Sequence, residues 1–333
     1  MLAFYDKTMN KFIFAVCFIL FVHTSGISAQ AMMGPYWLYD NHYLTDKYII
    51  NPAFAGNPYD PKIFVSTQRT NVQLRDAPAI HIAGAHGRLG VDRSKFSKYL
   101  SNERKARNAF GGLVFADNNI LFQTVGIKLD YAYTVPLNQK YTNLSFGLGG
   151  MFFSKRVRLD KYDSALTNDP LIAASMGNHT MIPDFNAGFL LNHHQLYVGF
   201  SVSQLLENSF QFSTLNYTPP RVYRNYYLLT GYRFVYKEFE LEPSIAVGHN
   251  FAPKTYSNCG NFVDVNIEFF LKPAIFTLSY RFDGYISTSL LYRAHGLELG
   301  IRSELFSTNT SDAPFIGIGL MASYTFLSSN IIR

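Results

Sequence analysis

The chain has 333 residues, of which 48% are hydrophobic and 16% aromatic, and its formal net charge is +6. This modest charge gives no support to nucleic-acid binding, which usually requires a strongly basic face. The mean hydropathy is close to zero, and no apolar run after residue 30 approaches the roughly 20 residues of a membrane-spanning helix, so the composition excludes a helical membrane protein.

The first 29 residues have the pattern of a secretory signal peptide. Two lysines precede an apolar run from 12 to 22, and Ile27-Ser28-Ala29 offers a small-residue cleavage site before Gln30. The apolar run is about 11 residues long, which is too short to span a membrane as a helix. After cleavage one cysteine, Cys259, would remain, so an internal disulfide is excluded.

Residues 30–62 show no strand pattern. They are rich in aromatic residues and contain Asn51-Pro52-Ala53-Phe54-Ala55-Gly56, in which Asn-Pro and the glycine are typical of turns. We expect this region to form a periplasmic or plug segment that precedes the strands of the chain.

From residue 63 onward, apolar and polar residues alternate with a period of two, which predicts strands with one apolar face. In the last of these segments Ile318 and Leu320 alternate with Gly317 and Gly319, and elsewhere mid-strand charges lie opposite the apolar positions. The predicted strands cover residues 63–69, 79–87, 109–116, 124–135, 143–153, 184–191, 195–203, 225–236, 239–249, 261–270, 274–282, 285–292, 296–304 and 315–326.

An even number of alternating strands in an exported chain predicts an all-β fold, a transmembrane antiparallel up-and-down β-barrel of about 14 strands. We expect the barrel to cover 63–327, with a C-terminal tail at 328–333, and the last strand to close against the strand near Ile63. Connections after even-numbered strands are mostly short and those after odd-numbered strands mostly long, as in bacterial outer-membrane barrels whose two ends are periplasmic. The expected location is the bacterial outer membrane.

The connection from Arg88 to Asn108 departs from this alternation, because it is long and lies on the expected periplasmic side. Its charge is strongly biased, since beyond Arg88 only Asp92 and Glu103 oppose six basic residues. It is either a solvated turn or a docking surface for an acidic partner. The basic residues of this candidate surface are Arg93, Lys95, Lys98, Arg104, Lys105 and Arg107.

The chain contains no strong catalytic or metal-binding motif. Gly199-Phe200-Ser201 begins like a nucleophile elbow but lacks the second glycine and lies inside a predicted strand. His81 and His86 are separated by an odd interval and should point to opposite faces of a strand. The acidic residues at 160–169 lack the pattern of an EF-hand loop. We therefore expect no catalytic residue, metal ion or cofactor.

Several elements resemble those of the PorP/SprF family, outer-membrane proteins of the type IX secretion and gliding machinery. The Ile50–Gly56 element is similar to the family's Ile-Asn-Pro-Ala-Tyr-Ala-Gly, with Phe54 in place of tyrosine. Further similar elements follow in the same order and cover most of the mature chain. They lie at 129–133, 144–148, 183–188, 198–205, 230–234, 241–244 and 278–282.

The resemblance implies a non-enzymatic accessory protein that helps particular large secreted proteins, such as adhesins, reach or stay on the cell surface. The implied partners are the C-terminal domain of a secreted cargo protein, other type IX secretion components and the lipid bilayer, but no nucleic acid. Asn51, Pro52, Ala53, Phe54, Ala55 and Gly56 are the candidate partner-binding residues, together with the basic connection. The alternatives are a small-solute channel and a barrel hydrolase.

Overall fold

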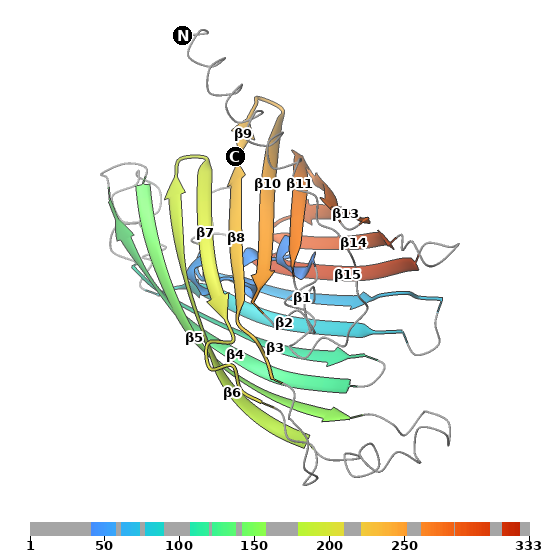
Figure 1. Cartoon of the computed structure of the whole chain (residues 1–333). Coiled ribbons are helices and arrows are strands. Elements are labelled where there is room, and N and C mark those ends of the chain that lie inside the picture. Colours follow the sequence, from blue (N-terminus) through green and yellow to red (C-terminus); the bar gives the residue numbers. More distant parts are fainter. Residues whose placement is uncertain are drawn as a thin grey trace.

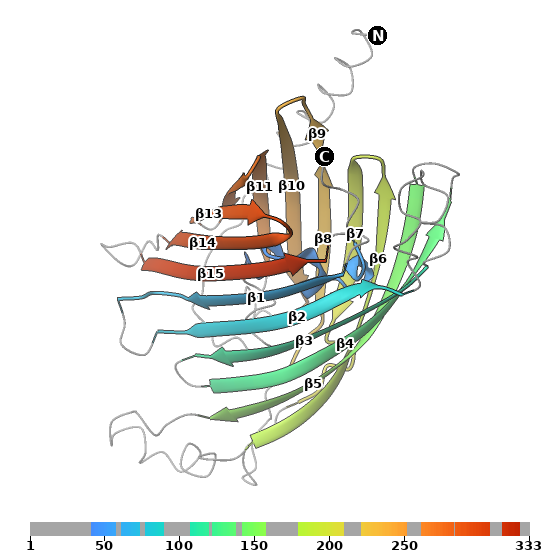
Figure 2. The same ribbon diagram turned by 180° about the vertical axis from the view of Figure 1, so that it is seen from behind.

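The computed structural model describes residues 41–57, 61–73, 77–89, 107–119, 122–137, 142–157, 179–209, 221–251, 261–282, 284–306 and 315–326. Fifteen strands form one antiparallel sheet that closes on itself (Figures 1 and 2). The strands are β1 (Lys62–Arg69), β2 (Ala79–Arg88), β3 (Asn108–Asn118), β4 (Phe122–Pro136), β5 (Thr142–Val157), β6 (His179–His193), β7 (Leu196–Ser203), β8 (Asn225–Tyr232), β9 (Phe234–Val235), β10 (Phe239–Asn250), β11 (Phe262–Leu271), β12 (Ala274–Arg281), β13 (Tyr285–Ala294), β14 (Leu297–Phe306) and β15 (Phe315–Thr325).

The barrel closes where its last strand meets its first. β15 pairs with β1 over eight positions, with Ile63 opposite Tyr324. β8 and the two-residue β9 both pair with β10, so together they form one interrupted strand of a 14-strand barrel. The predicted fold class, strand number and closing seam are therefore confirmed.

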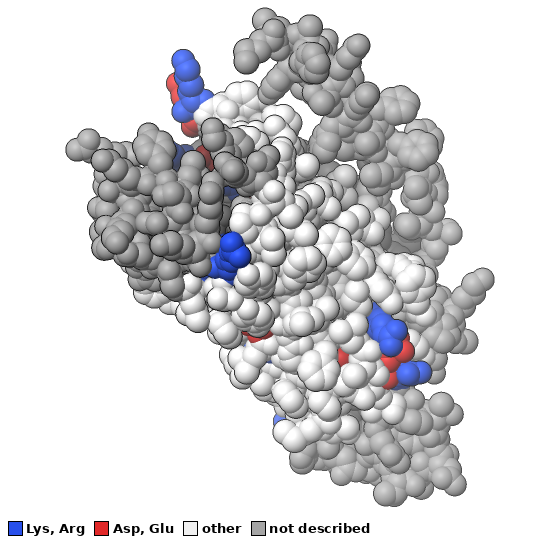
Figure 3. Space-filling view, turned by 90° about the vertical axis from the view of Figure 1, so that its left-hand side faces the viewer, with Lys and Arg blue, Asp and Glu red and all other residues white. Residues whose placement is uncertain are grey.

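Alternate residues of each strand face the outside and the lumen. On β4, Ile127 and Leu129 are exposed while Lys128 and Asp130 are buried. On the face seen in Figure 3, the surface formed by described residues is mostly uncharged, and charged side chains gather in a few places. An uncharged outer face with charges inside is the pattern of a barrel that spans lipid. Among the described residues, no helix is long and apolar enough to cross a membrane.

β6 begins at His179, five residues before the predicted start, and so contains Pro183 within the strand. A proline has no backbone N–H and is tolerated where a strand lacks a neighbour on one side. The pairing of β6 with β7 begins only at Ala187, so Pro183 lies in a part of β6 that is paired with β5. This explains why the proline does not end the strand.

The predicted strand 225–236 is interrupted at Arg233. β8 pairs with β10 up to Gly231 opposite Ser244, and pairing resumes with Phe234 opposite Leu241. In this register Tyr232 faces Pro243, which has no N–H to donate to the ladder. The missing hydrogen bond accounts for the break, which leaves the Arg233 side chain free to turn towards β10.

One end of the barrel carries the tight turns at 194–195, 236–238, 272–273 and 295–296, and we call it the short-turn end. At the turn between β13 and β14, His295 and Gly296 both have positive φ angles, as two-residue hairpins require. The opposite, long-loop end includes one short connection that the strand prediction missed, at 119–121. Loop asymmetry makes the short-turn end the expected periplasmic side.

Candidate functional site

Residues 41–57, which we call the lumen segment, lie among the inward-facing side chains of the barrel. The segment contains three short 3-10 helices, η2 (Asn41–Leu44), η3 (Lys47–Ile49) and η4 (Pro52–Phe54). Asp46 caps η3 by accepting the Tyr48 N–H at 3.0 Å, and Asn51 caps η4 by accepting the Ala53 N–H at 2.9 Å. Side-chain caps of this kind satisfy the free N–H groups at a helix start.

The barrel wall has a glycine seat for η4, formed by Gly147, Gly188 and Gly199 on β5, β6 and β7. A Cβ at Gly147 would collide with the backbone of Pro52 and Ala53, and one at Gly188 would collide with the Asn51 side chain. At Gly199 it would come within 2.9 Å of the Phe54 ring. The absence of three side chains therefore allows the segment to touch the wall directly.

Buried polar contacts fasten the segment further. The Asn51 amide donates to the carbonyl oxygens of Phe189 at 3.2 Å and Phe200 at 3.4 Å, which joins the segment to β6 and β7. Lys128 Nζ donates to the Ile49 carbonyl at 3.0 Å. These bonds pair groups that would otherwise be buried without partners, which is costly in a barrel interior.

Tyr48 and Gly56 make two more ties. The Tyr48 hydroxyl donates to Asp130 Oδ2 at 2.6 Å, and burial together with this carboxylate raises the pKa of Tyr48 well above its usual range. Gly56, with a φ of 70°, donates its N–H to His86 Nδ1 at 3.1 Å and accepts from Arg88 Nε at 2.9 Å. A side chain at Gly56 would meet the Arg88 side chain at 2.6 Å, so both its φ angle and its surroundings require glycine.

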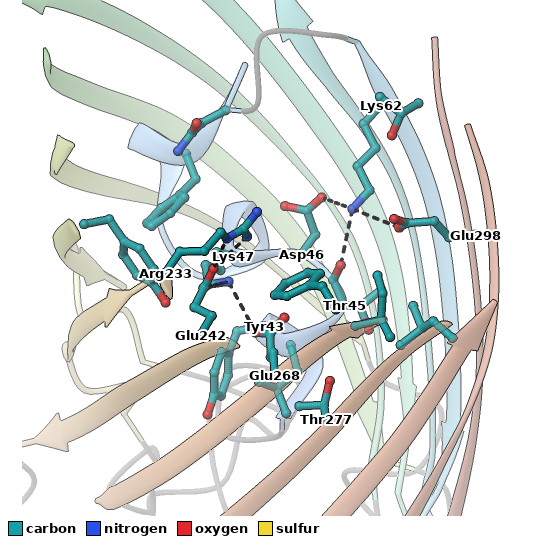
Figure 4. A pocket seen from close by; sticks show the side chains of 18 of the residues that line it. Tyr43, Thr45, Asp46, Lys47, Lys62, Arg233, Glu242, Glu268, Thr277 and Glu298 are labelled. Atoms are coloured by element: carbon teal, nitrogen blue, oxygen red, sulfur yellow. Dashed lines mark hydrogen bonds and ion pairs between the residues drawn. The ribbon is translucent and has the colours of Figure 1, made fainter. Parts of the chain in front are cut away.

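Between the lumen segment and the β10–β14 wall lies a cavity of about 500 Å³ at the short-turn end (Figure 4). Its volume is within the range of roughly 300–1,000 Å³ found for ligand sites. The lining combines both charge signs with apolar groups. It includes Lys47, Lys62, Arg233, Arg293, Asp46, Glu242, Glu268, Glu298, Phe54, Leu196, Phe270, Ile275, Thr277 and Leu291.

An ion-pair cluster forms one side of this cavity. Lys47 Nζ lies 3.2 Å from Glu242 and 3.5 Å from Glu268, and Arg233 reaches Glu242 at 2.6 Å. Figure 4 shows Lys47, Arg233 and Glu242 pointing towards one another. Although burial alone would lower the pKa of Lys47, the two carboxylates raise it well above its usual range, so Lys47 is charged. Arg233 also lies 4.4 Å over the Phe270 ring.

A second ion-pair cluster lies across the cavity. Lys62 Nζ is 3.1 Å from Asp46 and 4.0 Å from Glu298, and His86 Nε2 is 3.1 Å from Asp46. Although burial alone would raise the pKa of Asp46, the Lys62 ammonium and His86 lower it well below its usual range. Asp46 is therefore an ionised carboxylate that links the segment to β1 and β2.

The structure buries the predicted element Asn51–Gly56 against the barrel wall. Its present contacts are with strands, so a direct role in partner binding stays a prediction that requires the segment to move. Arg93, Lys95, Lys98, Arg104 and Lys105 lie outside the described residues. Arg107 is described and exposed, and donates to the Tyr133 hydroxyl at 3.4 Å. The prediction for the basic connection is untested.

Sequence reasoning placed charged residues in mid-strand opposite the apolar positions, and two of these, Arg281 and Asp264, pair at 2.6 Å between the neighbouring strands β12 and β11. It missed Lys47 and Asp46, which lie outside any strand pattern. It also gave no role to the three seat glycines, although each lies within an element that resembles the PorP/SprF family. No local signal links these glycines to residues 51–54.

The residues considered for other chemistry have structural contacts. Ser201 is buried and its hydroxyl donates to the Ile50 carbonyl at 2.8 Å. His81 and His86 point to opposite faces, with His81 beside Thr67 on the outside and His86 inside. Within the described part of the chain, His, Cys, Asp and Glu form no group suited to a metal ion.

Comparisons with known proteins give one extensive match. The family described as "Type IX secretion system membrane protein PorP/SprF" matches residues 36–315. No curated protein matches the chain.

Solved structures that are similar include outer-membrane protein Omp33 of Acinetobacter baumannii, with 11% identity, a TM-score of 0.45, and coverage of 80% of this chain and 98% of that one. The TodX monoaromatic hydrocarbon channel is 10% identical, with a TM-score of 0.46 and coverage of 84% and 94%. The CymD monoaromatic hydrocarbon channel is also 10% identical, with a TM-score of 0.46 and coverage of 90% and 94%.

Proposed function

Because the chain belongs to the PorP/SprF family of type IX secretion system membrane proteins, we propose that it assists the export or cell-surface retention of specific large secreted proteins such as adhesins. Family membership and the barrel fold establish an outer-membrane protein with a role in type IX secretion. The family is one of secretion-system membrane proteins and not a known enzyme class, and we propose a non-enzymatic role for this member.

The observation that carries the proposal is the occupied lumen. The lumen segment lies on the glycine seat and is tied to β1, β2, β4, β6, β7, β10 and β11 by hydrogen bonds and ion pairs. A channel for small solutes requires a free passage through this part of the barrel, whereas an accessory protein does not. The buried segment therefore favours a scaffold for protein partners over a diffusion pore.

The charges inside the barrel support the same preference. Ion-selective pores usually present one dominant sign of charge to the passing ion. Here Glu242 and Glu268 are matched by Lys47 and Arg233, and Asp264 by Arg281. Such pairs stiffen the wall and give no preference for either sign of permeating ion.

The partners that we propose are the C-terminal domain of a secreted cargo protein and other components of the secretion system. The short-turn end, if periplasmic, would present the cavity and the Arg88–Asn108 connection to these components. The candidate contacts Asn51–Gly56 would become available only if the segment left its seat.

Deletion of the gene tests the proposal. We expect a cognate adhesin to be lost from the cell surface, which surface immunolabelling of whole cells would measure, and re-expression of the wild-type chain to restore it. Unchanged surface display together with unchanged motility would overturn the proposed function.

The purified barrel tests the alternative that the protein is a small-solute channel. In planar bilayers we expect no stable single-channel conductance from the wild-type protein, because the lumen segment fills the passage. A stable open conductance would favour the small-solute channel instead.

A further inference from the structure

The paired charges of the cavity differ in how far they are exposed. The carboxylates that line it are buried, and the most exposed of them, Glu298, has only 13% of its side chain exposed. The Arg233 and Arg293 side chains, in contrast, are 42% and 51% exposed. Charge is balanced by the ion pairs, but a molecule that enters the cavity meets arginine side chains before it meets carboxylates.

Arg293 has hydrogen-bond donors to spare. A guanidinium carries five N–H donors. Arg293 directs Nε and Nη2 to one oxygen of Glu298, at 2.7 and 2.5 Å, and its Nη1 has no partner among the described residues. The other oxygen of Glu298 accepts the Ser323 hydroxyl at 2.8 Å. The exposed side of Arg293 can therefore bind a second carboxylate while the pair with Glu298 stays intact.

Arg233 is held in a similar way at the other end of the same wall. Its Nε and Nη2 bind Glu242 at 2.7 and 2.6 Å. Its Nη1 has a longer ion pair of 3.5 Å, with Glu240. The guanidinium lies 4.4 Å over the Phe270 ring, which helps to fix its position. One half-exposed arginine therefore stands at each end of this wall.

Between the two arginines lies an apolar row, formed by Phe270, Ile275 and Leu291. These residues are direct cross-strand neighbours on β11, β12 and β13, and all three line the cavity. Arg293 follows Leu291 by two residues and so points to the same face of β13. With strands about 4.8 Å apart and a rise of about 3.3 Å per residue, the backbone positions of Phe270 and Arg293 are separated by roughly 12 Å. The row is an apolar floor that ends in an arginine on each side.

A peptide in an extended conformation matches this spacing. Residues four apart in an extended chain lie about 13 Å apart and point to the same side, and the residue midway between them points there as well. Acidic residues at the two ends and an apolar residue in the middle would therefore meet the two arginines and the apolar row. Arginine recognises a carboxylate with parallel hydrogen bonds, whereas it has no acceptor to offer a basic group.

We propose that the cavity binds an extended segment of a protein partner through two acidic side chains four residues apart, which accept hydrogen bonds from Arg293 and Arg233. An apolar side chain midway between them packs on the apolar row. The choice of a protein as the source of this segment rests on the proposed secretion role, whereas the preference for two spaced carboxylates follows from the arginines alone. Both arginines lie close to tight turns, so the partner would approach from the short-turn end.

Peptide binding to the purified full-length barrel in detergent tests the inference. The probe is fluorescein-labelled Gly-Glu-Thr-Leu-Thr-Glu-Gly, followed by fluorescence polarisation. One reference peptide has glutamine in place of both glutamates, and the other, Gly-Glu-Glu-Thr-Leu-Thr-Gly, has the same composition with adjacent carboxylates. We expect the probe to bind about tenfold more tightly than the glutamine peptide, as loss of hydrogen bonds between charged groups implies.

The two reference peptides test different parts of the proposal. Equal affinity for the probe and the glutamine peptide would overturn the assignment of a carboxylate site. Equal affinity for the two glutamate peptides would overturn the spacing set by the two arginines, because only the probe can reach both at once.

Two variants and a control locate the site. Arg293→Gln should remove the preference for glutamate over glutamine. Arg221→Gln should keep this preference, since Arg221 is also a half-exposed arginine paired with a glutamate but lies at the long-loop end. Leu291→Glu retains both arginines and places a carboxylate between them from within the barrel, so it should abolish peptide binding. Leu291→Glu gives the answer independently if Arg293→Gln does not fold, and unchanged binding by Leu291→Glu would overturn the assignment.

Inorganic phosphate tests whether the ligand is a peptide. We expect phosphate to compete only at much higher concentration than unlabelled peptide, since it has no apolar side chain for the apolar row and cannot reach both arginines. Displacement at the same concentration would identify a simple anion site and overturn the peptide inference. Loss of adhesin display on gene deletion without peptide binding would overturn this inference alone, whereas peptide binding with normal display would overturn only the proposed function.

Discussion

The two sides of the lumen hold the same segment in different ways. On the β5–β7 side, Gly147, Gly188 and Gly199 let the backbone of η4 approach the wall directly. On the β10–β14 side, a cavity lies between part of the segment and the wall, and Lys47 reaches Glu242 and Glu268 at its edge. Close packing responds little to pH, whereas ion pairs depend on the ionisation of both of their members.

This comparison suggests a division of roles. The glycine side fixes the position of the segment, because any added side chain there would overlap it. The charged side leaves a cavity beside its ion pairs. Variants on the two sides should therefore behave differently.

The largest effect is expected on the glycine side. Gly147→Val would place three carbon atoms where the backbone of Pro52 and Ala53 lies, and should destabilise the folded barrel by about 3 kcal/mol or more. The loss of stability would be measured as a lower temperature at which the protein shifts from its folded to its unfolded mobility on an electrophoresis gel. We also expect the displaced segment to open a conductance in planar bilayers.

A matched control lies on the same strand. At Gly150, a Cβ would have Phe185 as its nearest neighbour at 3.9 Å, an ordinary contact. Gly150→Val should therefore leave both the thermal transition and the absence of conductance unchanged. Equal destabilisation by the two variants would contradict the glycine seat and indicate a general intolerance of valine on β5.

A smaller effect is expected from the ion pairs. Lys47→Met would leave Glu242 and Glu268 with one cation fewer, at a cost of about 2 kcal/mol because the Lys47 side chain is partly exposed. Adding Glu268→Gln should recover part of this loss by removing the extra charge. Thermal unfolding of the single and double variants measures the loss of stability. If Glu268→Gln caused a further loss that added to that of Lys47→Met, the two carboxylates would not share the Lys47 ammonium.

The smallest effect concerns pH. Since the pKa of Asp46 is lowered in the folded protein, its ionised form stabilises the fold above the unfolded pKa, and this contribution is lost as pH falls. Wild type should lose about 1–2 kcal/mol of stability between roughly pH 5 and pH 3 through Asp46. The Asp46→Asn variant should be less stable at neutral pH, and its stability should depend less on pH in the same thermal assay. An unchanged profile would exclude Asp46 as the titrating group.

Much of the barrel could be predicted from the sequence, because its signals are local. Alternation along β4 separates Ile127 and Leu129 from Lys128 and Asp130 without any knowledge of the neighbouring strands. The predicted start of β6 at residue 184 excluded Pro183, because proline is rare inside a strand that is paired on both sides. Pro183 is acceptable in β6 because this part of the strand is paired with β5 alone. Pro243 is a sequence signal for the break at Arg233, because proline lacks a backbone N–H. The position of the break on the neighbouring strand depends on the register, which places Tyr232 opposite Pro243.

The candidate site depended on contacts between distant residues. Asn51 lies 138 residues before Phe189 and 149 before Phe200, and no periodicity links such positions. The element Asn51–Gly56 could be recognised, but the prediction that it binds partners did not foresee that it would be buried. Lys47 and Asp46 acquired roles only through carboxylates and a lysine contributed by separate strands.

The sequence by itself determined the strand faces, the approximate strand number and the closing seam, because alternation and turn residues act over a few positions. The tertiary structure decided what fills the lumen and where space remains. Those properties arise when closure of the barrel brings the glycines of β5–β7 and the carboxylates of β10 and β11 to opposite sides of one segment, and closure is a property of the whole sheet.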